Sequence, residues 1–264
     1  MKTLMDYEAP AGLLAGRVVL VTGAAGGLGS AVAGAAAGAG ATAVLLDKNV
    51  PGLEQVYDAI EQAGGPQPAI YPLDLQGATP QHHQELAATV EKQLGRLDGL
   101  VHCAAIPGLR TPLEQYDPQL WGQVIQVNLH APFLLTRACL PLLRASDAGR
   151  VIFTAADVGR RGRAYWGAYA VAAAGVENLA QVLADELENT SAVRVMTLDP
   201  GPVRTPMRRF FFPGEDADAL PDPDTVARAY LYLLGPEGAG HHGRALLAQS
   251  GKTGFSMQAN EPPP

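Results

Sequence analysis

The chain has few residues of the types that build metal sites and disulfide frameworks. Its two cysteines, Cys103 and Cys139, do not show metal-ligand spacing. Histidines 82–83 and 241–242 are adjacent pairs, and neighbouring side chains on a helix or strand point apart. We therefore expect no metal site. Free cysteines further indicate a reducing compartment, which we take to be the cytoplasm.

Positive charge is scarce, and charge of either sign is missing from one long stretch. The formal net charge is −7, which argues against nucleic acid or anionic lipid as a partner. Residues 18–46 carry no charge and are numerous enough to span a bilayer. However, they divide into a β-branched run, a glycine turn and an Ala-rich helix, the pattern of a buried βαβ unit. We therefore expect no membrane span and, since the first dozen residues lack an apolar core, no signal peptide.

Lysine is missing between residues 93 and 251, and serine is missing from the shorter stretch between residues 146 and 191. Lysine occurs only at positions 2, 48, 92 and 252, and no serine lies between Ser146 and Ser191. An ammonium group is therefore excluded between residues 93 and 251, and a serine hydroxyl is excluded between the two named serines.

What is present is a regular alternation of strand and helix patterns. Strands are predicted at 17–22, 42–47, 69–73, 97–103, 150–154, 193–198 and 243–248. Helices are predicted at 27–39, 51–63, 80–94, 119–143 with a kink near Pro132, 164–188 and 224–234. This order predicts an α/β fold, with one doubly wound Rossmann domain over residues 1–264, a parallel sheet of about seven strands and helices on both faces. Residues 201–223 form an excursion rich in Pro, Arg and Phe, and residues 261–264 are predicted to fray.

A glycine-rich turn, Thr22–Gly29, links the first predicted strand to the first helix. Gly23 permits a tight turn, Gly27 allows backbone to approach a pyrophosphate, and Gly29 allows the helix to pack closely. Phosphates would then meet amide groups at a helix N-terminus. This context predicts a dinucleotide site; a merely structural turn is the alternative.

Three charged residues bear on which dinucleotide binds. Asp47 ends the second strand, where a carboxylate accepts hydrogen bonds from ribose hydroxyls and repels a 2′-phosphate, which favours NAD. Lys48 could pair with that phosphate, so NADP is not excluded. Asp74 ends the third strand and is placed to meet the adenine amino group, or else to cap a helix.

These motifs, with Val127-Asn128-Leu129 and the run Asp199–Thr205, resemble those of the short-chain dehydrogenase/reductase family over nearly the whole length. Residues 158–169 are most similar to its YciK-type bacterial subgroup of uncharacterised oxidoreductases. The resemblance implies additional dinucleotide contacts at Leu28, Leu75, Ala104, Tyr169, Pro200, Gly201, Val203 and Thr205.

The resemblance also implies a catalytic group of Asn, Ser, Tyr and Lys acting on a small carbonyl or alcohol. Asn128 and Tyr169 match it, whereas the serine position is Ala156 and the lysine position is Ala173. Thr154 lies one pleat repeat from position 156. Nearby arginines could lend positive charge but cannot replace an ammonium group directly; these are Arg160, Arg161, Arg163 and Arg204.

The resemblance implies two further features. The segment 201–223, with Arg208–Phe212, corresponds to a substrate lid, which either covers the crevice or buries its aromatic side chains against a neighbouring subunit. The Ala-rich face of Tyr169–Ala180 suits a homodimer or homotetramer.

Three functions remain open from the sequence. The first is a dinucleotide-binding pseudo-enzyme or regulator. The second is a slow or atypical NAD(P)-dependent oxidoreductase, and the third is a structural partner of an active relative in a mixed oligomer.

Overall fold

The computed structural model describes residues 3–249, which fold around a seven-stranded sheet. All neighbouring strands are parallel, in the order β3-β2-β1-β4-β5-β6-β7. The strands are β1 Val18–Thr22, β2 Thr42–Asp47, β3 Ala69–Pro72, β4 Gly99–His102, β5 Arg150–Thr154, β6 Arg194–Asp199 and β7 Ala245–Leu247. Strand order reverses between β1 and β4, and ligand crevices of such sheets lie at the carboxyl ends of the strands at this reversal.

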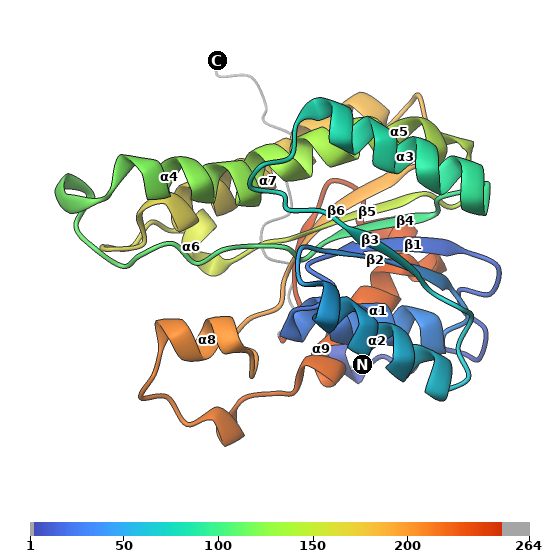
Figure 1. The fold of residues 1–264 in the computed structure, drawn as a ribbon, viewed down its shortest axis with the longest axis horizontal. Coiled ribbons are helices and arrows are strands. Elements are labelled where there is room, and N and C mark those ends of the chain that lie inside the picture. The colour runs from blue at the N-terminus through green and yellow to red at the C-terminus, as the bar shows by residue number, and fades with distance from the viewer. Residues whose placement is uncertain (1–2, 250–264) are drawn as a thin grey trace, which may run out of the picture.

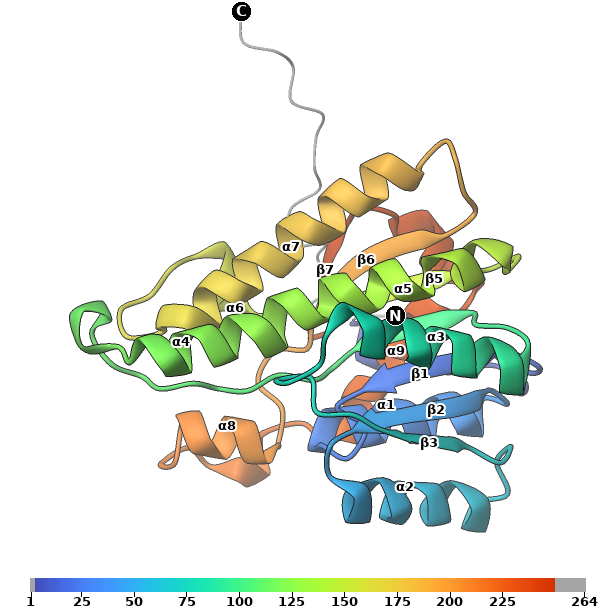
Figure 2. The same cartoon turned by 45° about the horizontal axis from the view of Figure 1, so that its top comes forward.

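Helices cover both faces of the sheet (Figure 1). One layer holds α1 Gly27–Gly38, α2 Val50–Gln62 and α9 Pro223–Leu234. The opposite layer holds α3 Pro80–Leu94, α5 Ala131–Ala145 and α7 Gly167–Leu187, which Figure 2 shows in front of the sheet. The predicted doubly wound α/β fold is therefore confirmed.

The strands bury both faces because successive side chains point to opposite sides. In β1, Val19 and Val21 join the core beneath α1 and α9, whereas Val18 and Leu20 join the core beneath α3, α5 and α7. The near-continuous runs of Val and Leu in the sequence are explained by this two-sided burial.

The long helical region predicted at 119–143, with a kink near Pro132, contains a π-helical turn just before that proline. Helix α4 (Pro118–Ile125) runs into η3 (Gln126–His130), which leads into α5. Proline has no N–H to donate to the carbonyl four residues earlier, so the backbone preceding Pro132 adopts the wider turn, and Asn128 lies within it.

The helix predicted from residue 164 begins later, at Gly167, because Tyr165 has a φ of 73° that a right-handed helix cannot include. Shorter elements complete the fold: η1 Leu4–Asp6, η2 Leu113–Gln115, α6 Asp157–Arg160, α8 Pro206–Phe211, η4 Ala217–Ala219 and η5 Pro236–His241. Two of these, α8 and η4, lie in the predicted excursion 201–223, and the tail predicted at 261–264 lies outside the described residues.

Candidate dinucleotide and catalytic site

The Thr22 side chain and the backbone of Gly23 hold the carboxyl ends of β1 and β4 together. The Thr22 hydroxyl oxygen accepts hydrogen bonds from the amides of Cys103 and Ala104, each at 3.1 Å. Gly23 has a φ of +68°, and a Cβ atom there would lie 2.8 Å from the Ala104 backbone. Only glycine fits this turn, as the sequence predicted.

The turn then presents the N-terminus of α1. Gly26 is its N-cap and provides no side-chain cap. A Cβ at Gly29 would lie 2.1 Å from the Gly23 carbonyl oxygen, so the helix start packs directly on the turn. A Cβ at Gly27 would lie 3.3 Å from Thr205 and Pro206, which places the start of α8 beside the turn. Leu28 packs against the hydrophobic core, leaving backbone N–H groups as the exposed chemistry of this end.

The residues predicted to select the dinucleotide gather at the ends of β2 and β3. The Asp47 carboxylate accepts from the amides of Ala25, at 3.3 Å, and Asn49, at 3.0 Å. Lys48 Nζ lies 3.9 Å from Asp74 Oδ2. Asp74 does not cap a helix, because Thr79 is the N-cap of α3; Asp74 instead accepts from the Gln76 amide.

The remaining residues predicted to contact the dinucleotide differ in whether their side chains or only their backbones can face a ligand. The side chains of Leu75 and Val203 are buried in the two cores, so only their backbones can face a ligand. Thr205 caps α8 and accepts from the Arg208 amide at 3.2 Å. The carbonyl of Pro200 accepts from Gln249, and a Cβ at Gly201 would meet the same side chain.

Asn128 uses its side-chain amide to hold the loop that follows β4. Its oxygen accepts from the Ile106 amide at 2.8 Å, and its nitrogen donates to the Ile106 carbonyl at 3.0 Å. Asn128 therefore fixes the crevice wall in addition to any role toward a ligand.

Tyr169 lies at the start of α7 beneath α8. Its hydroxyl is 4.0 Å from Met207 Sδ, and its ring packs edge-on against Phe211 at 5.4 Å. Burial, with smaller effects from Asp199 and Asp157, raises the pKa of Tyr169 to about 12. The phenol is therefore neutral at physiological pH.

Ala156 and Ala173 leave no polar group where the family resemblance implies serine and lysine. Ala156 is the N-cap of α6 without a side-chain cap, and it borders the aromatic cluster around Tyr169. Ala173 faces α6 closely, since a Cβ at Gly159 would lie 2.9 Å from the Ala173 Cβ. The two short side chains allow α6 and α7 to pack tightly against each other.

Three of the four arginines considered as sources of charge are already paired. Arg160 donates to Glu177 at 3.0 Å and to Asp199 at 2.5 Å, forming a mostly buried triad. Arg163 pairs with Asp157, and Arg204 pairs with Asp218 and Asp222. Arg161 makes no ion pair within residues 3–249. None of these guanidinium groups lowers the pKa of Tyr169, which burial raises.

Thr154 and His102 are held by structural contacts, whereas the buried ring nitrogens of His83 have no hydrogen-bond partner within the described residues. The Thr154 hydroxyl lies 2.9 Å from the Tyr230 hydroxyl and 3.5 Å from Cys103 Sγ. His102 contacts Thr136 of α5, opposite Cys103 across β4. Within the described part of the chain, no group of three or more His, Cys, Asp or Glu side chains is arranged to hold a metal ion.

The 201–223 segment packs its phenylalanines onto the aromatic cluster around Tyr169 to different extents. Phe211 is buried, with its ring centroid 4.6 Å from that of Trp166, whereas Phe210 is 55% exposed. Sequence analysis did not single out Arg110, which donates to the Phe211 carbonyl at 3.1 Å. A lone arginine in a loop carries no motif, so no sequence signal would have marked it.

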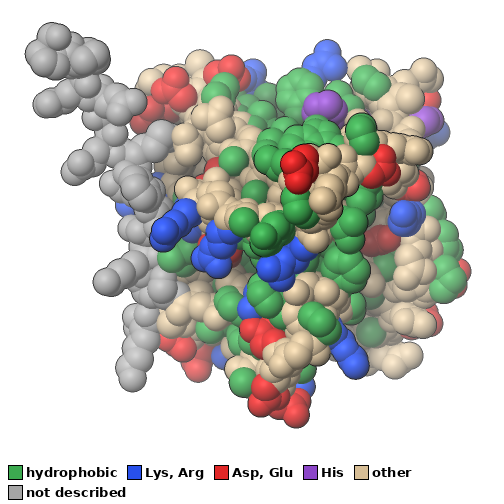
Figure 3. All heavy atoms as spheres, turned by 90° about the vertical axis from the view of Figure 1, so that its left-hand side faces the viewer, with side chains coloured by type: hydrophobic (Ala, Val, Ile, Leu, Met, Phe, Trp, Pro, Cys, Tyr) green, Lys and Arg blue, Asp and Glu red, His purple; other side chains and the backbone are tan. Residues whose placement is uncertain are grey.

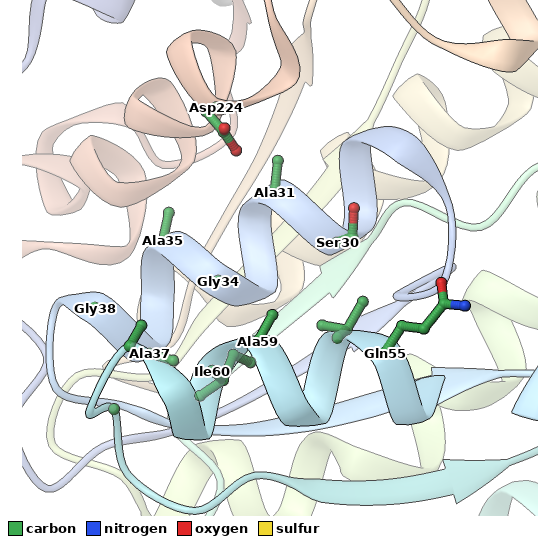
Figure 4. Close-up of a pocket in the computed structure, with 13 residues that line it drawn as sticks. Ser30, Ala31, Gly34, Ala35, Ala37, Gly38, Gln55, Ala59, Ile60 and Asp224 are labelled. Atoms are coloured by element: carbon green, nitrogen blue, oxygen red, sulfur yellow. The ribbon is translucent and has the colours of Figure 1, made fainter. Parts of the chain in front are cut away.

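A 510 Å³ groove lies elsewhere, between α1 and α2 with Asp224 of α9 at its rim (Figure 4). Its walls are mainly small residues such as Gly34 and Ala59, and it is separate from Tyr169. Among residues 3–249, none of the helices combines the length and hydropathy needed to cross a membrane.

Comparison with known proteins agrees with this geometry. The chain is 42% identical to the uncharacterized oxidoreductase YciK of Escherichia coli K12 over 96% of this chain and 100% of YciK. A solved short chain dehydrogenase from Pseudomonas syringae is 50% identical, with a TM-score of 0.89 over 92% of this chain and 99% of that one. A short chain dehydrogenase from Escherichia coli CFT073, complexed with NADPH, is 43% identical, with a TM-score of 0.88 over 91% of this chain and 100% of that one.

The model of the short chain dehydrogenase family matches residues 17–216. With the parallel sheet, the glycine turn at β1 and the near full-length similarity to these relatives, the chain belongs to the short-chain dehydrogenase family.

Proposed function

We propose that this protein binds NAD(H) and acts as a pseudo-enzyme, sensing or responding to the dinucleotide more than reducing carbonyl substrates. The observation that carries the proposal is the environment of Tyr169. Its hydroxyl faces the sulfur of Met207, no cation lowers its pKa, and the neighbouring positions 156 and 173 are alanine. The chemical end of the site is thus incomplete, while the phosphate end keeps its geometry.

The residues present fit the adenosine and diphosphate half of a dinucleotide. Gly23 and Gly29 leave a turn that a single Cβ would fill, and α1 offers uncapped backbone N–H groups to phosphate. Asp47, held by two backbone amides, would accept from ribose hydroxyls. Ala173, in contrast, has no group to hold the nicotinamide ribose.

A bound dinucleotide would supply a hydride donor or acceptor above the crevice. Asn128 would keep the β4 loop in place, and Tyr169 would hold its proton on the phenolic oxygen. With a pKa of about 12 the phenol can donate a hydrogen bond, but it is a poor acid–base catalyst at neutral pH.

We favour NAD over NADP because Asp47 would face a 2′-phosphate. The NADPH-bound relative is evidence for the nicotinamide dinucleotide class as a whole. In this chain Lys48 is the cation nearest to that site in sequence, and it lies beside Asp74, which competes with a phosphate for it.

A slow or atypical NAD(P)-dependent oxidoreductase is the second candidate. The retained Asn128 and Tyr169 and the aromatic cover formed by α8 favour it. The third candidate is a structural partner in a mixed oligomer. It rests on exposed apolar side chains of α5 and α7, namely Phe133, Val171 and Val182, which would equally suit a homodimer or homotetramer. We propose that the protein works in the cytoplasm.

Calorimetric titration of NADH and NADPH, followed by a turnover screen over aldehydes, ketones and alcohols, tests the proposal. We expect NADH to bind without turnover, roughly 10- to 150-fold more weakly than in complete relatives because a charged hydrogen bond is lost at position 173. Asp47→Ser should shift the preference toward NADPH, and Lys48→Met, which removes the cation that could pair with a 2′-phosphate, should shift it the other way. Absence of binding by both dinucleotides at millimolar concentration would refute the proposal, whereas measurable turnover of any carbonyl or alcohol would favour the second candidate.

A further inference from the structure

The crevice rim is rich in arginine although the whole chain is acidic. Three segments contribute: the loop after β4 supplies Arg110, the 157–163 region supplies Arg160, Arg161 and Arg163, and the 201–223 segment supplies Arg204, Arg208 and Arg209. Figure 3 faces the end of the molecule that carries α6 and α8, and it shows Lys and Arg side chains among hydrophobic ones. Carboxylates lie in the same segments, because residues 201–223 also carry Glu215, Asp216, Asp218 and Asp222.

Most of this positive charge is neutralised within the protein. Besides the ion pairs of Arg160, Arg163 and Arg204, Arg208 makes two hydrogen bonds of 2.6 Å to Glu215. Arg110 resembles Arg161 and Arg209 in having no carboxylate partner within residues 3–249. Its one hydrogen bond goes to the carbonyl of Phe211.

Arg110 is held by aromatic faces. Its guanidinium carbon lies 5.1 Å from the ring centroid of Trp166 and 5.3 Å from that of Phe212. Both rings belong to the cluster that also contains Tyr169 and Phe211. Arg110 thus lies at the edge of the cover over the Tyr169 ring, in an exposed position of the β4 loop.

Stacking orients a guanidinium group without using its hydrogen-bond donors. The contacts of the Arg110 guanidinium carbon with the Trp166 and Phe212 rings use none of its N–H donors. One of five N–H groups is used on Phe211. The remaining donors can bind the two oxygens of a carboxylate side by side, which is the geometry that arginine recognises best.

We propose that Arg110 is a specificity-determining residue that binds the carboxylate of a small, flat, carboxylate-bearing ligand in the crevice. The proposal rests on the proposed function in that the ligand shares the crevice with the dinucleotide. Phe212, which is only partly buried, would contact the apolar body of the ligand, and the buried Trp166 would support Arg110 from within the cluster. The hydrogen bond to the Phe211 carbonyl links Arg110 to α8. A ligand bound to Arg110 would therefore hold α8 more firmly over Tyr169.

The test compares benzoate with benzamide, which share a ring and differ in charge. Calorimetric titrations are made with and without saturating NADH on wild type, Arg110→Met, Arg110→Lys and Arg161→Met. The last is the matched control, because Arg161 is a rim arginine without an ion pair. Tryptic cleavage after Arg208 and Arg209 reports the closure of α8, and melting temperatures report folding.

We expect wild type to bind benzoate at least about tenfold more tightly than benzamide. Arg110→Met should lose this preference, Arg110→Lys should keep part of it, and Arg161→Met should behave as wild type. Benzoate should slow tryptic cleavage in wild type and not in Arg110→Met.

Wild type that binds benzoate no better than benzamide, including no binding of either, overturns the proposal. The same conclusion follows if Arg110→Met, folded as judged by melting, keeps the preference. Failure of the proposed function would be seen separately, as absence of NADH binding in the same wild-type sample.

Discussion

The hydroxyl oxygen of Tyr169 lies 4.0 Å from the sulfur of Met207, so the side chain expected to exchange a proton with a substrate is covered by an apolar side chain of α8. A thioether is a weak hydrogen-bond acceptor and provides no charge to stabilise a phenolate. Burial therefore dominates the acidity of this residue. The contact with Met207 also places α8 on the side from which a substrate oxygen would have to approach Tyr169.

The first prediction concerns the titration of Tyr169. Because burial raises its pKa to about 12, the difference in phenolate absorbance between wild type and Tyr169→Phe should stay near zero from pH 7 to pH 10. Ala173→Lys should move the onset downward by about 1–3 pH units, since a nearby cation favours the charged phenolate. A Tyr169 phenolate signal already present near pH 7 would contradict this account.

The second prediction concerns catalysis. Ordinary carbonyl substrates should be turned over very slowly or not at all, and Ala156→Ser with Ala173→Lys should raise the rate. Restoring a phenolate stabilisation of about 4 kcal/mol corresponds to roughly 10³-fold. The gain should be partial, because α6 packs against Ala173 at Gly159 and a longer side chain must displace it.

Addition of Tyr169→Phe to the double variant is the control for this experiment. The added rate should disappear if Tyr169 carries the restored chemistry. Wild type that reduces a simple ketone at tens per second, with Tyr169→Phe unchanged, would show that both the pseudo-enzyme proposal and the role given to Tyr169 are wrong.

The sequence predicted the sheet and the phosphate turn because their signals are local. Runs of buried Val and Leu mark parallel strands, and Gly23 marks a backbone with a positive φ that other residues rarely adopt. The end of β2 at Asp47 and the whole of α3 follow from the same short-range patterns. The backbone of the turn where we propose that the dinucleotide binds depends on such elements, so it could be predicted from the sequence.

The chemical end depends on contacts between residues far apart in the chain, which no local pattern marks. The cover of Tyr169 by Met207, the stacking of Arg110 on Trp166 and the burial of Arg160 are examples. Sequence analysis treated Arg160 and Arg163 alike, as arginines near the crevice. Only the fold distinguishes them, because one lies between two buried carboxylates and the other is on the surface.

The third prediction uses that difference. Arg160→Met should destabilise the protein by about 3–5 kcal/mol, since it leaves Glu177 and Asp199 buried without their cation. Burial already raises the pKa of both carboxyls despite Arg160. Arg163→Met is the matched control, and because the Arg163–Asp157 pair is largely exposed it should cost at most about 1 kcal/mol. Urea unfolding at pH 7 measures both, and equal losses would contradict the assigned burial.

The fourth prediction concerns acid stability and His102. Burial lowers the pKa of this histidine to about 3 from an ordinary 6.5, so it is neutral in the folded state. Below pH 6.5 the unfolded chain takes up a proton that the folded chain does not, and stability falls until the pH reaches the folded pKa. His102 should therefore contribute roughly 1.4 kcal/mol of lost stability per pH unit in this window, or about 2 kcal/mol between pH 6.5 and 5.

His102→Asn should reduce the fall in unfolding free energy between pH 6.5 and 5 by about 2 kcal/mol, whatever it does to stability at pH 7. The comparison is of slopes, because losing the 2.8 Å contact with Thr136 and the stacking on Phe153 lowers the absolute value. His130→Asn, which replaces an exposed histidine, is the control. Since burial also lowers the pKa of His83, part of the acid sensitivity should persist in His102→Asn. Identical slopes for wild type and His102→Asn between pH 7 and 5 would show that His102 is protonated in the folded protein, contrary to its buried position beneath α5.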